Sequence, residues 1–490
     1  MAKRPSTPTL EVIARYNVCP PPNSAVPTSL PLTFFDIPWL FFSPTQTLFF
    51  YEYPNPTCHF LSTTLPTLTH SLKLTLQHFF ALAGTVVLPP DSSAATPQIS
   101  YDHGNYVTLV AAESKGDFFH LSGNHQRCVD DFYPLLPPLP SSFAAASKTK
   151  QEIPLLSIQI TIFSNSGLCI AFSCHHVAAD ARTFNNFIKT WASISRDPCF
   201  LIKAPPFYDR TVVKDSYGLH STFLNQWSNK KSSLAIGSNN NITTVLNVPE
   251  SEMVRATFLM SPAHMEKLKQ WIISRCNLTN KPHIPCLSPY NLTSSFIWVC
   301  LIKAQGKVSG KLFGKKASYF GFNAGGIIRL DYPIPTCYFG NCIGFARCMA
   351  IESELCGEDG MIVAANAIGN KIKELNEAMF KGAENWISDW EVFYGGDESN
   401  HVLVMGSPKV DLYDTDFGWG RPNKIEEISI DNYANAISFT ESRQVKGGIE
   451  VGLALPKAKM DAFTSFFTQE GEEWKRGAHR DTTRKVLEYL

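Results

Sequence analysis

The sequence predicts an α/β protein built from two domains. At 490 residues the chain is too long for one hydrophobic core, because domains usually hold roughly 50–250 residues. Strand-like and helix-like segments alternate in both halves of the chain. Residues 201–250 between them are polar and rich in Pro, Ser, Asn and Gly, which is typical of a linker. We therefore expect an N-terminal domain over residues 1–200, a crossover over 201–250 and a C-terminal domain over 251–490.

The first long periodic segment is Leu65–Gly84, which is predicted to be a helix. Its apolar side chains recur at helical spacing, and Gly84 is a suitable residue to end it. The stripe is formed by Leu72, Leu76, Phe79 and Phe80.

A β-hairpin is predicted further along the N-terminal half. Two β-rich runs, Leu155–Phe163 and Leu168–Cys174, flank the turn sequence Ser-Asn-Ser-Gly. The second run leads directly into His175 and His176. Helical spacing of apolar residues resumes after Asp180, so this aspartate is expected to open a helix.

The C-terminal half shows the same alternation of elements. Ser261-Pro262 is a favourable helix start, since proline suits the first helical position. Strands are expected over residues 317–325 and 447–455, and helices near 361–380 and 459–467. The charged last stretch, residues 471–490, is expected to be exposed.

Composition excludes several classes of function. The formal net charge is zero and no basic run is present, so a nucleic-acid partner is not expected. No apolar run reaches the roughly 18 residues needed to span a bilayer, and no secretory signal opens the chain, so we expect a cytoplasmic protein. The 13 cysteines are scattered and contain no C-x-x-C pair, which argues against both a disulfide framework and a zinc site.

The most informative polar stretch is SCHHVAADAR, residues 173–182. Neighbouring strand residues point to opposite faces, so His175 and His176 are not expected to serve one site, and a His-His-Asp metal site is disfavoured. No serine-hydrolase elbow, zinc-protease helix or phosphate-binding loop is present. Two interpretations remain open: His176 is a general base at a strand end, or it is a satisfied core histidine with Asp180 as an ordinary N-cap.

Two further stretches carry unusual composition. Asp416–Gly420 reads D-F-G-W-G, and its glycines permit positive φ or close backbone approach. Tyr338–Cys342 reads Y-F-G-N-C and follows a proline-rich segment. Taken separately, both are first interpreted as structural turns.

Together and in this order, the three stretches resemble the BAHD family of plant acyl-CoA-dependent acyltransferases, which carries H-x-x-x-D near the middle and D-F-G-W-G near the end. The Y-F-G-N-C variant is similar to that of the subgroup acylating phenolic glycosides, often with malonyl-CoA. The resemblance covers roughly residues 8–468. It implies two similar α/β domains of mixed sheet and helices, of the chloramphenicol acetyltransferase type, joined by a long crossover with a channel between them.

The resemblance also implies roles for single residues. His176 would remove the proton of a sugar hydroxyl, Asp180 would be a structural brace, and Asp416 would belong to a structural motif. The oxyanion would need a donor; Asn341, Trp419 or a nearby Thr or Ser are candidates, and the sequence does not choose among them. Malonyl-CoA would be a co-substrate, and no metal or bound cofactor is implied.

Arg182 is the predicted partner of the malonyl carboxylate, because a planar guanidinium matches a carboxylate. The alternative is that Arg182 pairs with Asp180 or lies in solvent. One departure from the family is clear: its D-x-R-x-R segment reads Gly325-Gly-Ile327-Ile-Arg329 here, so Gly325 replaces the acidic residue, Ile327 replaces the first arginine and only Arg329 remains. An arginine of this segment salt-bridges the motif aspartate in relatives, and if it is the absent one, Asp180 lacks that brace.

The leading functional hypothesis is therefore an O-malonyltransferase acting on the 6-hydroxyl of a flavonoid, isoflavonoid or other phenolic glucoside, working as a monomer. One alternative keeps the fold and uses an aromatic donor such as coumaroyl-CoA. The other is a catalytically impaired relative that binds glycosides, which the replacement at Ile327 motivates.

Overall fold

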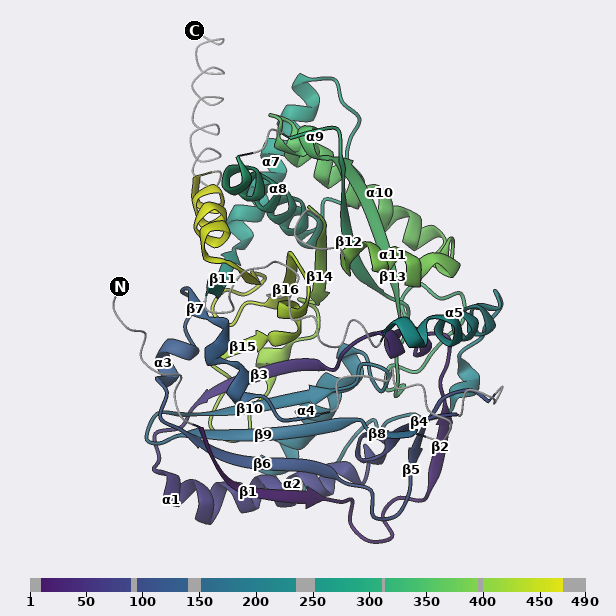
Figure 1. Ribbon diagram of the computed structural model, residues 1–490, viewed down its shortest axis with the longest axis vertical. Helices are drawn as coiled ribbons and strands as arrows, with labels where there is room; N and C mark the ends of the chain where they lie inside the picture. Colours follow the sequence, from purple (N-terminus) through teal and green to yellow (C-terminus); the bar gives the residue numbers. More distant parts are fainter. Residues whose placement is uncertain are drawn as a thin grey trace.

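The structure is a computed structural model that describes residues 10–89, 95–139, 151–234, 252–310, 313–394 and 400–469. The described residues form three sheets, with helices packed against them (Figure 1). The predicted α/β class is confirmed, and two of the sheets are large and mixed. The domain bounds 1–200, 201–250 and 251–490 stay a prediction. The predicted exposure of residues 471–490 lies outside the described residues.

The first sheet has six strands in the order β1-β6-β9-β10-β3-β15, and it lies across the lower half of Figure 1. Its β6 and β9 are parallel and every other neighbouring pair is antiparallel. The strands are β1 (Leu10–Val18), β6 (Val107–Ser114), β9 (Leu156–Phe163), β10 (Gly167–Cys174), β3 (Thr45–Glu52) and β15 (Lys424–Glu427). The predicted hairpin is confirmed as β9 and β10.

Two helices, α2 (Leu65–Leu76) and α4 (Ala181–Arg196), pack against each other beside this sheet. The apolar stripe of α4 includes Trp191, whose indole N–H donates to the Leu68 carbonyl at 3.1 Å. The predicted helix over Leu65–Gly84 starts and ends too late. The helical run begins with α1 (Thr57–His59), continues through the π-helical turn η2 (Phe60–Thr64) and ends with α2 at Leu76. Phe79 leaves the helical region with φ −104° and ψ 37°, and a separate short turn, η3 (Phe80–Ala83), follows.

The second sheet has seven strands in the order β13-β12-β14-β16-β17-β11-β7. Helices α7 (Pro262–Leu278), α8 (Pro289–Ser309) and α10 (Gly360–Glu377) cover one of its faces. The strands are β13 (Ile343–Ile351), β12 (Ala317–Gly325), β14 (Val402–Gly406), β16 (Ala436–Glu441), β17 (Ile449–Pro456), β11 (Met253–Met260) and β7 (Arg127–Cys128). The elements predicted in this half are confirmed, including the helix that starts at Pro262 with Ser261 as its cap.

A small antiparallel sheet stands beside the first one. Its strands follow the order β2 (Thr28–Pro31), β5 (Gln98–Tyr101), β4 (Thr85–Leu88) and β8 (Gln151–Pro154). The remaining short helices include η1 (Ile37–Phe41), η6 (Arg210–Val212), α11 (Trp386–Glu391) and η12 (Ile428–Asn432).

The two halves exchange strands. The short β7 comes from the N-terminal half but pairs with β11 in the second sheet. In the opposite direction β15 comes from the C-terminal half and pairs with β3 in the first sheet. The exchange joins both halves through backbone hydrogen bonds, so each sheet needs residues from both.

The predicted crossover is more structured than its composition suggests. Helix α5 (Leu219–Leu234) occupies its middle, and Phe207 forms an isolated parallel bridge with Tyr338. The remainder, from residue 235 to 251, lies outside the described residues. None of the described helices combines the length and apolar character needed to cross a bilayer.

Candidate active site

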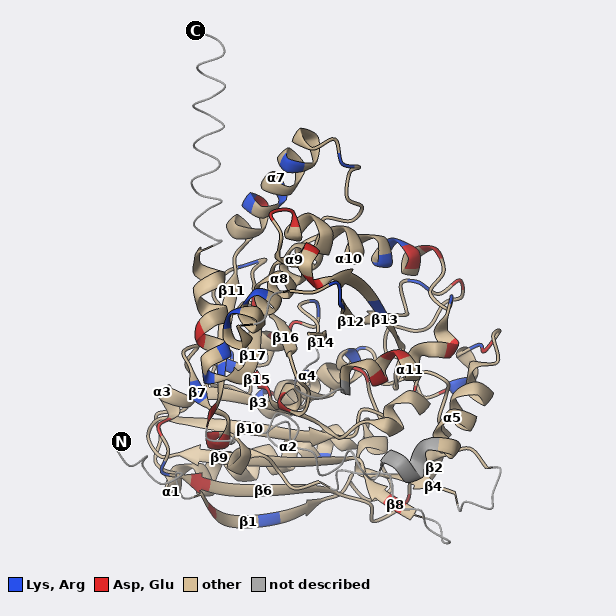
Figure 2. Ribbon diagram, turned by 45° about the horizontal axis from the view of Figure 1, so that its top comes forward, with Lys and Arg blue, Asp and Glu red and all other residues tan. Residues whose placement is uncertain are grey.

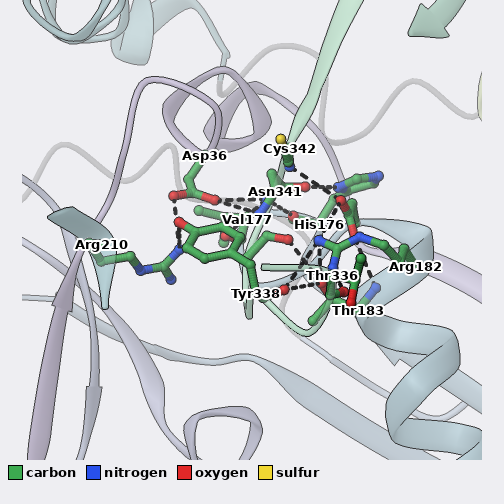
Figure 3. A network of polar contacts seen from close by, with 12 residues as sticks. Asp36, His176, Val177, Arg182, Thr183, Arg210, Thr336, Tyr338, Asn341 and Cys342 are labelled. Carbon is green, nitrogen blue, oxygen red and sulfur yellow. Dashed lines mark hydrogen bonds and ion pairs between the residues drawn. The ribbon is translucent and has the colours of Figure 1, made fainter. Parts of the chain in front are cut away.

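The two adjacent histidines follow the end of β10 and have different surroundings. His175 is fully buried, and its backbone N–H donates to the Leu155 carbonyl at 2.9 Å. His176 is only partly buried and turns toward the loop of Tyr338–Cys342 (Figure 3). The structure therefore separates the two side chains, in line with the expectation that they do not serve one site.

The hydrogen bond between His176 and Asn341 fixes the imidazole tautomer. The Asn341 Nδ2 group has three acceptors around it: Asp36 Oδ1 at 3.0 Å and the carbonyls of His176 and Val177 at 2.9 and 3.3 Å. Because backbone carbonyls only accept, the amide must keep Oδ1 toward His176 Nδ1, 3.1 Å away. His176 Nδ1 is then the donor, which leaves the lone pair of Nε2 available as a base.

Trp39 of η1 lies flat against the imidazole of His176. The ring centroids are 3.6 Å apart with an interplanar angle of 8°. Trp390 of α11 packs edge-on against Trp39 at 4.8 Å. Burial lowers the pKa of His176 below 6.5, although its own backbone, Asp180, Asn341 and Asp36 act in the opposite direction. The neutral, basic form is therefore favoured near neutral pH.

Asp180 is the N-cap of α4, and its carboxylate accepts from backbone N–H groups of two segments. Its Oδ1 accepts from the Thr183 N–H at 2.9 Å, and its Oδ2 accepts from the Cys342 N–H at 3.2 Å. Asp180 thus ties the start of α4 to the loop that carries Asn341, which is the geometry expected of a structural brace.

Arg182 supplies the positive charge beside Asp180 that the apolar Ile327 does not supply. Its Nη2 lies 3.4 Å from Asp180 Oδ2, and Ile327 packs against the hydrophobic core instead. The same guanidinium donates to the carbonyls of Thr336 and Tyr338 (Figure 3). The ion pair with Asp180 corresponds to the alternative interpretation of Arg182. Binding of a malonyl carboxylate by Arg182 stays a prediction.

The D-F-G-W-G turn lies at the other end of α4. Asp416 Oδ1 accepts from the N–H groups of Gly418 and Gly420 at 2.7 and 2.9 Å, and Oδ2 lies 3.4 Å from Arg196 Nη1. Helix α4 has 16 residues, so Asp416 is about 24 Å from the Asp180 end.

Trp419, in the same turn as Asp416, also lies away from His176. It packs on Tyr51 and Tyr53, at the end of β3 that pairs with the start of β10. About 26 Å of extended chain separates that end from His176. The arrangement does not support Trp419 as an oxyanion donor, and it does not support Asn341 either, because its amide hydrogens are already directed at three acceptors.

Three residues of this site are absent from the sequence-based prediction: Asp36, Trp39 and Arg210. The usable signal was a single carboxylate inside the apolar run LTFFDIPWLFF, since a charge in such a run requires a buried partner. Nothing local links that run to residues 176, 210 and 341. What the assembled geometry offers chemically is one oriented, neutral imidazole that can accept a proton from a hydroxyl.

Comparison with known proteins matches this chain to transferases. The model of the Transferase family matches residues 9–470. The chain is 34% identical to a malonyl-coenzyme A:anthocyanin 3-O-glucoside-6''-O-malonyltransferase of Dahlia pinnata, over 94% of this chain and 97% of the relative. It is 36% identical to a malonyl-coenzyme:anthocyanin 5-O-glucoside-6'''-O-malonyltransferase of Salvia splendens, over 91% and 93%. It is also 34% identical to a coumaroyl-CoA:anthocyanidin 3-O-glucoside-6''-O-coumaroyltransferase of Arabidopsis thaliana, over 93% and 96%.

Among solved structures, vinorine synthase has the same fold. The TM-score is 0.64 at 17% identity, and the match covers 93% of this chain and 96% of that one.

Proposed function

Since the chain belongs to the Transferase family, whose plant members are the BAHD acyltransferases, we propose that it transfers a malonyl group from malonyl-CoA to a glucoside. The acceptor is a flavonoid, isoflavonoid or other phenolic glucoside, and the acylated atom is the oxygen of the sugar's primary 6-hydroxyl. The observation that carries this proposal is His176, partly exposed, with Nδ1 directed at Asn341 Oδ1 and Nε2 left as a base.

The reaction then follows from the chemistry of a thioester and an alcohol. Nε2 of His176 takes the proton of the sugar hydroxyl while that oxygen attacks the thioester carbonyl. The tetrahedral intermediate collapses by breaking the C–S bond, and the imidazolium returns the proton to the CoA thiolate. The products are a malonyl ester and free CoA. No acyl-enzyme, metal or bound cofactor is required, and we propose a cytoplasmic monomer.

The donor is proposed to be malonyl-CoA because the Dahlia and Salvia relatives carry that donor in their names. An aromatic donor is the alternative, since the Arabidopsis coumaroyltransferase is similar to the same extent. A non-catalytic relative is less well supported. Its motivation was the missing arginine at Ile327, and the ion pair of Arg182 with Asp180 supplies a cation at that carboxylate.

The test is a panel of malonyl-, acetyl- and coumaroyl-CoA against flavonoid and simple phenolic glucosides, with products identified by mass. We expect malonyl esters that require His176 and are lost in His176→Ala. The matched control is His70→Ala, since His70 is an exposed histidine on α2. Exclusive turnover of coumaroyl-CoA would replace the malonyl assignment, and equal activity in His176→Ala would remove the histidine mechanism.

A further inference from the structure

Arg210 is a buried cation in a segment that composition alone presents as a linker. Its side chain is 9% exposed, its Nη1 donates to the Tyr338 hydroxyl at 2.7 Å, and Nη1 lies 3.5 Å from Asp36 Oδ2. The bridge between Phe207 and Tyr338 brings the crossover to this place. Gly340 has φ +139°, and a methyl group there would come within 2.2 Å of Nη1, so the loop passes directly over the guanidinium.

Asp36 is arranged to be a carboxylate rather than a carboxylic acid. It is fully buried and faces four N–H or O–H groups. Oδ2 accepts from the Thr33 N–H and hydroxyl at 2.8 and 2.7 Å, and Oδ1 accepts from the Asn341 N–H and Nδ2, both at 3.0 Å. An ionised carboxylate only accepts, so it matches this set of donors. A buried carboxylate also needs a nearby cation, and Arg210 is its ion-pair partner.

We propose that Arg210 is a positioning residue for the transfer reaction, because it anchors the Asp36 carboxylate and thereby helps to fix the Asn341 amide and the proton on His176 Nδ1. The inference rests on the proposed function in that His176 acts as the base. Arg210 contacts Asp36, Asp36 accepts from the Asn341 amide, and Asn341 accepts from His176 Nδ1 (Figure 3).

The physical step is a loss of alignment. Without Arg210 the buried Asp36 carboxylate loses its ion-pair partner and shifts away from Asn341. The carbonyls of His176 and Val177 still hold the Asn341 amide, but less tightly, and the hydrogen bond from His176 Nδ1 to Asn341 Oδ1 weakens. A larger share of the imidazole then carries its proton on Nε2, which cannot accept the proton of the hydroxyl.

Several other charged or titratable groups face this network. Burial raises the pKa of Tyr338 and of Cys342, the latter to about 12, so both stay protonated at neutral pH. Among the described residues, the groups around Asp36 are Arg210, Arg182, Asp180, Tyr338, Tyr208, Cys342 and His176.

The experiment compares Arg210→Met, Arg210→Lys and a control, Arg275→Met. Arg275 forms ion pairs with Asp359 and Glu358 beside α7, outside the His176 network. For Arg210→Met we expect kcat to fall roughly ten- to hundredfold near pH 6.5, with KM for malonyl-CoA within about twofold of the original protein. Arg210→Lys keeps the charge and restores most of kcat, and Arg275→Met leaves kcat unchanged.

A second measurement reads the tautomer directly. Nitrogen-15 NMR of histidine-labelled full-length protein, with His176→Ala to assign the signal, should show Nδ1–H in the original protein and a larger share of Nε2–H in folded Arg210→Met. An Nε2–H tautomer in the original protein would overturn the proposal, as would an unchanged kcat in Arg210→Met, or a Lys variant as impaired as the Met variant. If no donor is turned over, the proposed function fails, and the NMR result still decides the role of Arg210.

Discussion

The indole of Trp39 and the imidazole of His176 lie parallel and in contact, with centroids 3.6 Å apart. These residues are far apart in sequence and come from different elements: Trp39 from η1 and His176 from the segment after β10. The contact removes water from one face of the ring. The pKa of His176, the candidate base, therefore depends on the side chain of Trp39.

Trp39→Ala tests that link. Desolvation lowers the pKa of His176, so exposing the ring should raise this pKa toward 6.5. Because the neutral imidazole is the active form, the acid limb of the kcat/KM profile should move to higher pH and kcat should fall. Trp39→Phe keeps an aromatic ring against His176, so its acid limb should lie between those of the original protein and Trp39→Ala. An acid limb unmoved in both variants would show that Trp39 does not control this ionisation.

The lowered pKa of His176 also predicts the direction in which the free energy of unfolding changes with pH. With a lowered pKa, His176 in the folded state binds fewer protons than in the unfolded state just below pH 6.5. Its contribution to the free energy of unfolding is therefore lost as the pH falls through 6.5 toward the folded pKa. Thermal melts of Trp39→Ala should show a weaker acid-side decline than those of the original protein over this range.

Arg182→Ala separates the two interpretations of Arg182. As the ion-pair partner of Asp180, its loss should lower kcat for malonyl-CoA and acetyl-CoA alike, by roughly ten- to hundredfold, because the loop of Asn341 loses a support. As a carboxylate receptor, its loss should raise KM for malonyl-CoA alone. Steady-state kinetics with both donors decides between them, and Arg182→Lys shows whether the planar fork is required.

A buried charged cluster lies where the exchanged strands meet. It joins Arg127 of β7, Arg255 of β11 and Lys424 of β15 to acidic partners, and Figure 2 shows basic segments near β7, β11 and β17. The acidic partners are Glu426, Asp431 and Glu450. Burial alone would raise the pKa of Glu426, but the three cations lower it to about 2. For Asp431 burial dominates and raises the pKa to about 6, in spite of Arg255.

Arg255→Met should therefore destabilise the protein by about 3–5 kcal/mol at pH 7.5, because it leaves buried carboxylates without a counter-charge. Asp431 already binds a proton more readily when folded, so lowering the pH to 5 neutralises it and the deficit should shrink. Thermal melts at pH 7.5 and at pH 5 measure the loss of stability of Arg255→Met relative to the original protein. Lys457→Met, which breaks an exposed pair with Asp461, is the control and should change stability by less than about 1 kcal/mol. A larger deficit at pH 5 would contradict the assignment.

Asp416→Ala tests the distant turn. Loss of the acceptor for the N–H groups of Gly418 and Gly420 should cost about 1–3 kcal/mol of stability. Because α4 separates this turn from His176, the acid limb of kcat/KM should stay where it is in the original protein. An acid limb displaced as in Trp39→Ala would show that the two ends of α4 are coupled.

The local signals in the sequence predicted their elements well. Asp180 and Ser261 cap α4 and α7 as expected, since a side-chain cap depends only on the next three residues. The hairpin of β9 and β10 is equally local. The end of α2 was predicted too late because the apolar stripe continues into η3, where the backbone changes but the spacing does not.

The site was predicted only where one segment carried the signal. His176 and Asp180 lie four residues apart and were found together. Asp36 and Arg210 were not, because their roles arise from contacts across 128 or more positions of the chain. The exchange of β7 and β15 has the same origin: strand pairing is non-local, and β7 spans only Arg127–Cys128.

That exchange sets the order in which this chain is able to finish folding. Until residues 424–427 have left the ribosome, β3 is an open edge, and its sequence TQTLFFYE exposes apolar side chains to other nascent chains. An N-terminal fragment ending near residue 200 should accordingly aggregate when expressed alone and become soluble when the remaining segment is supplied on a second polypeptide.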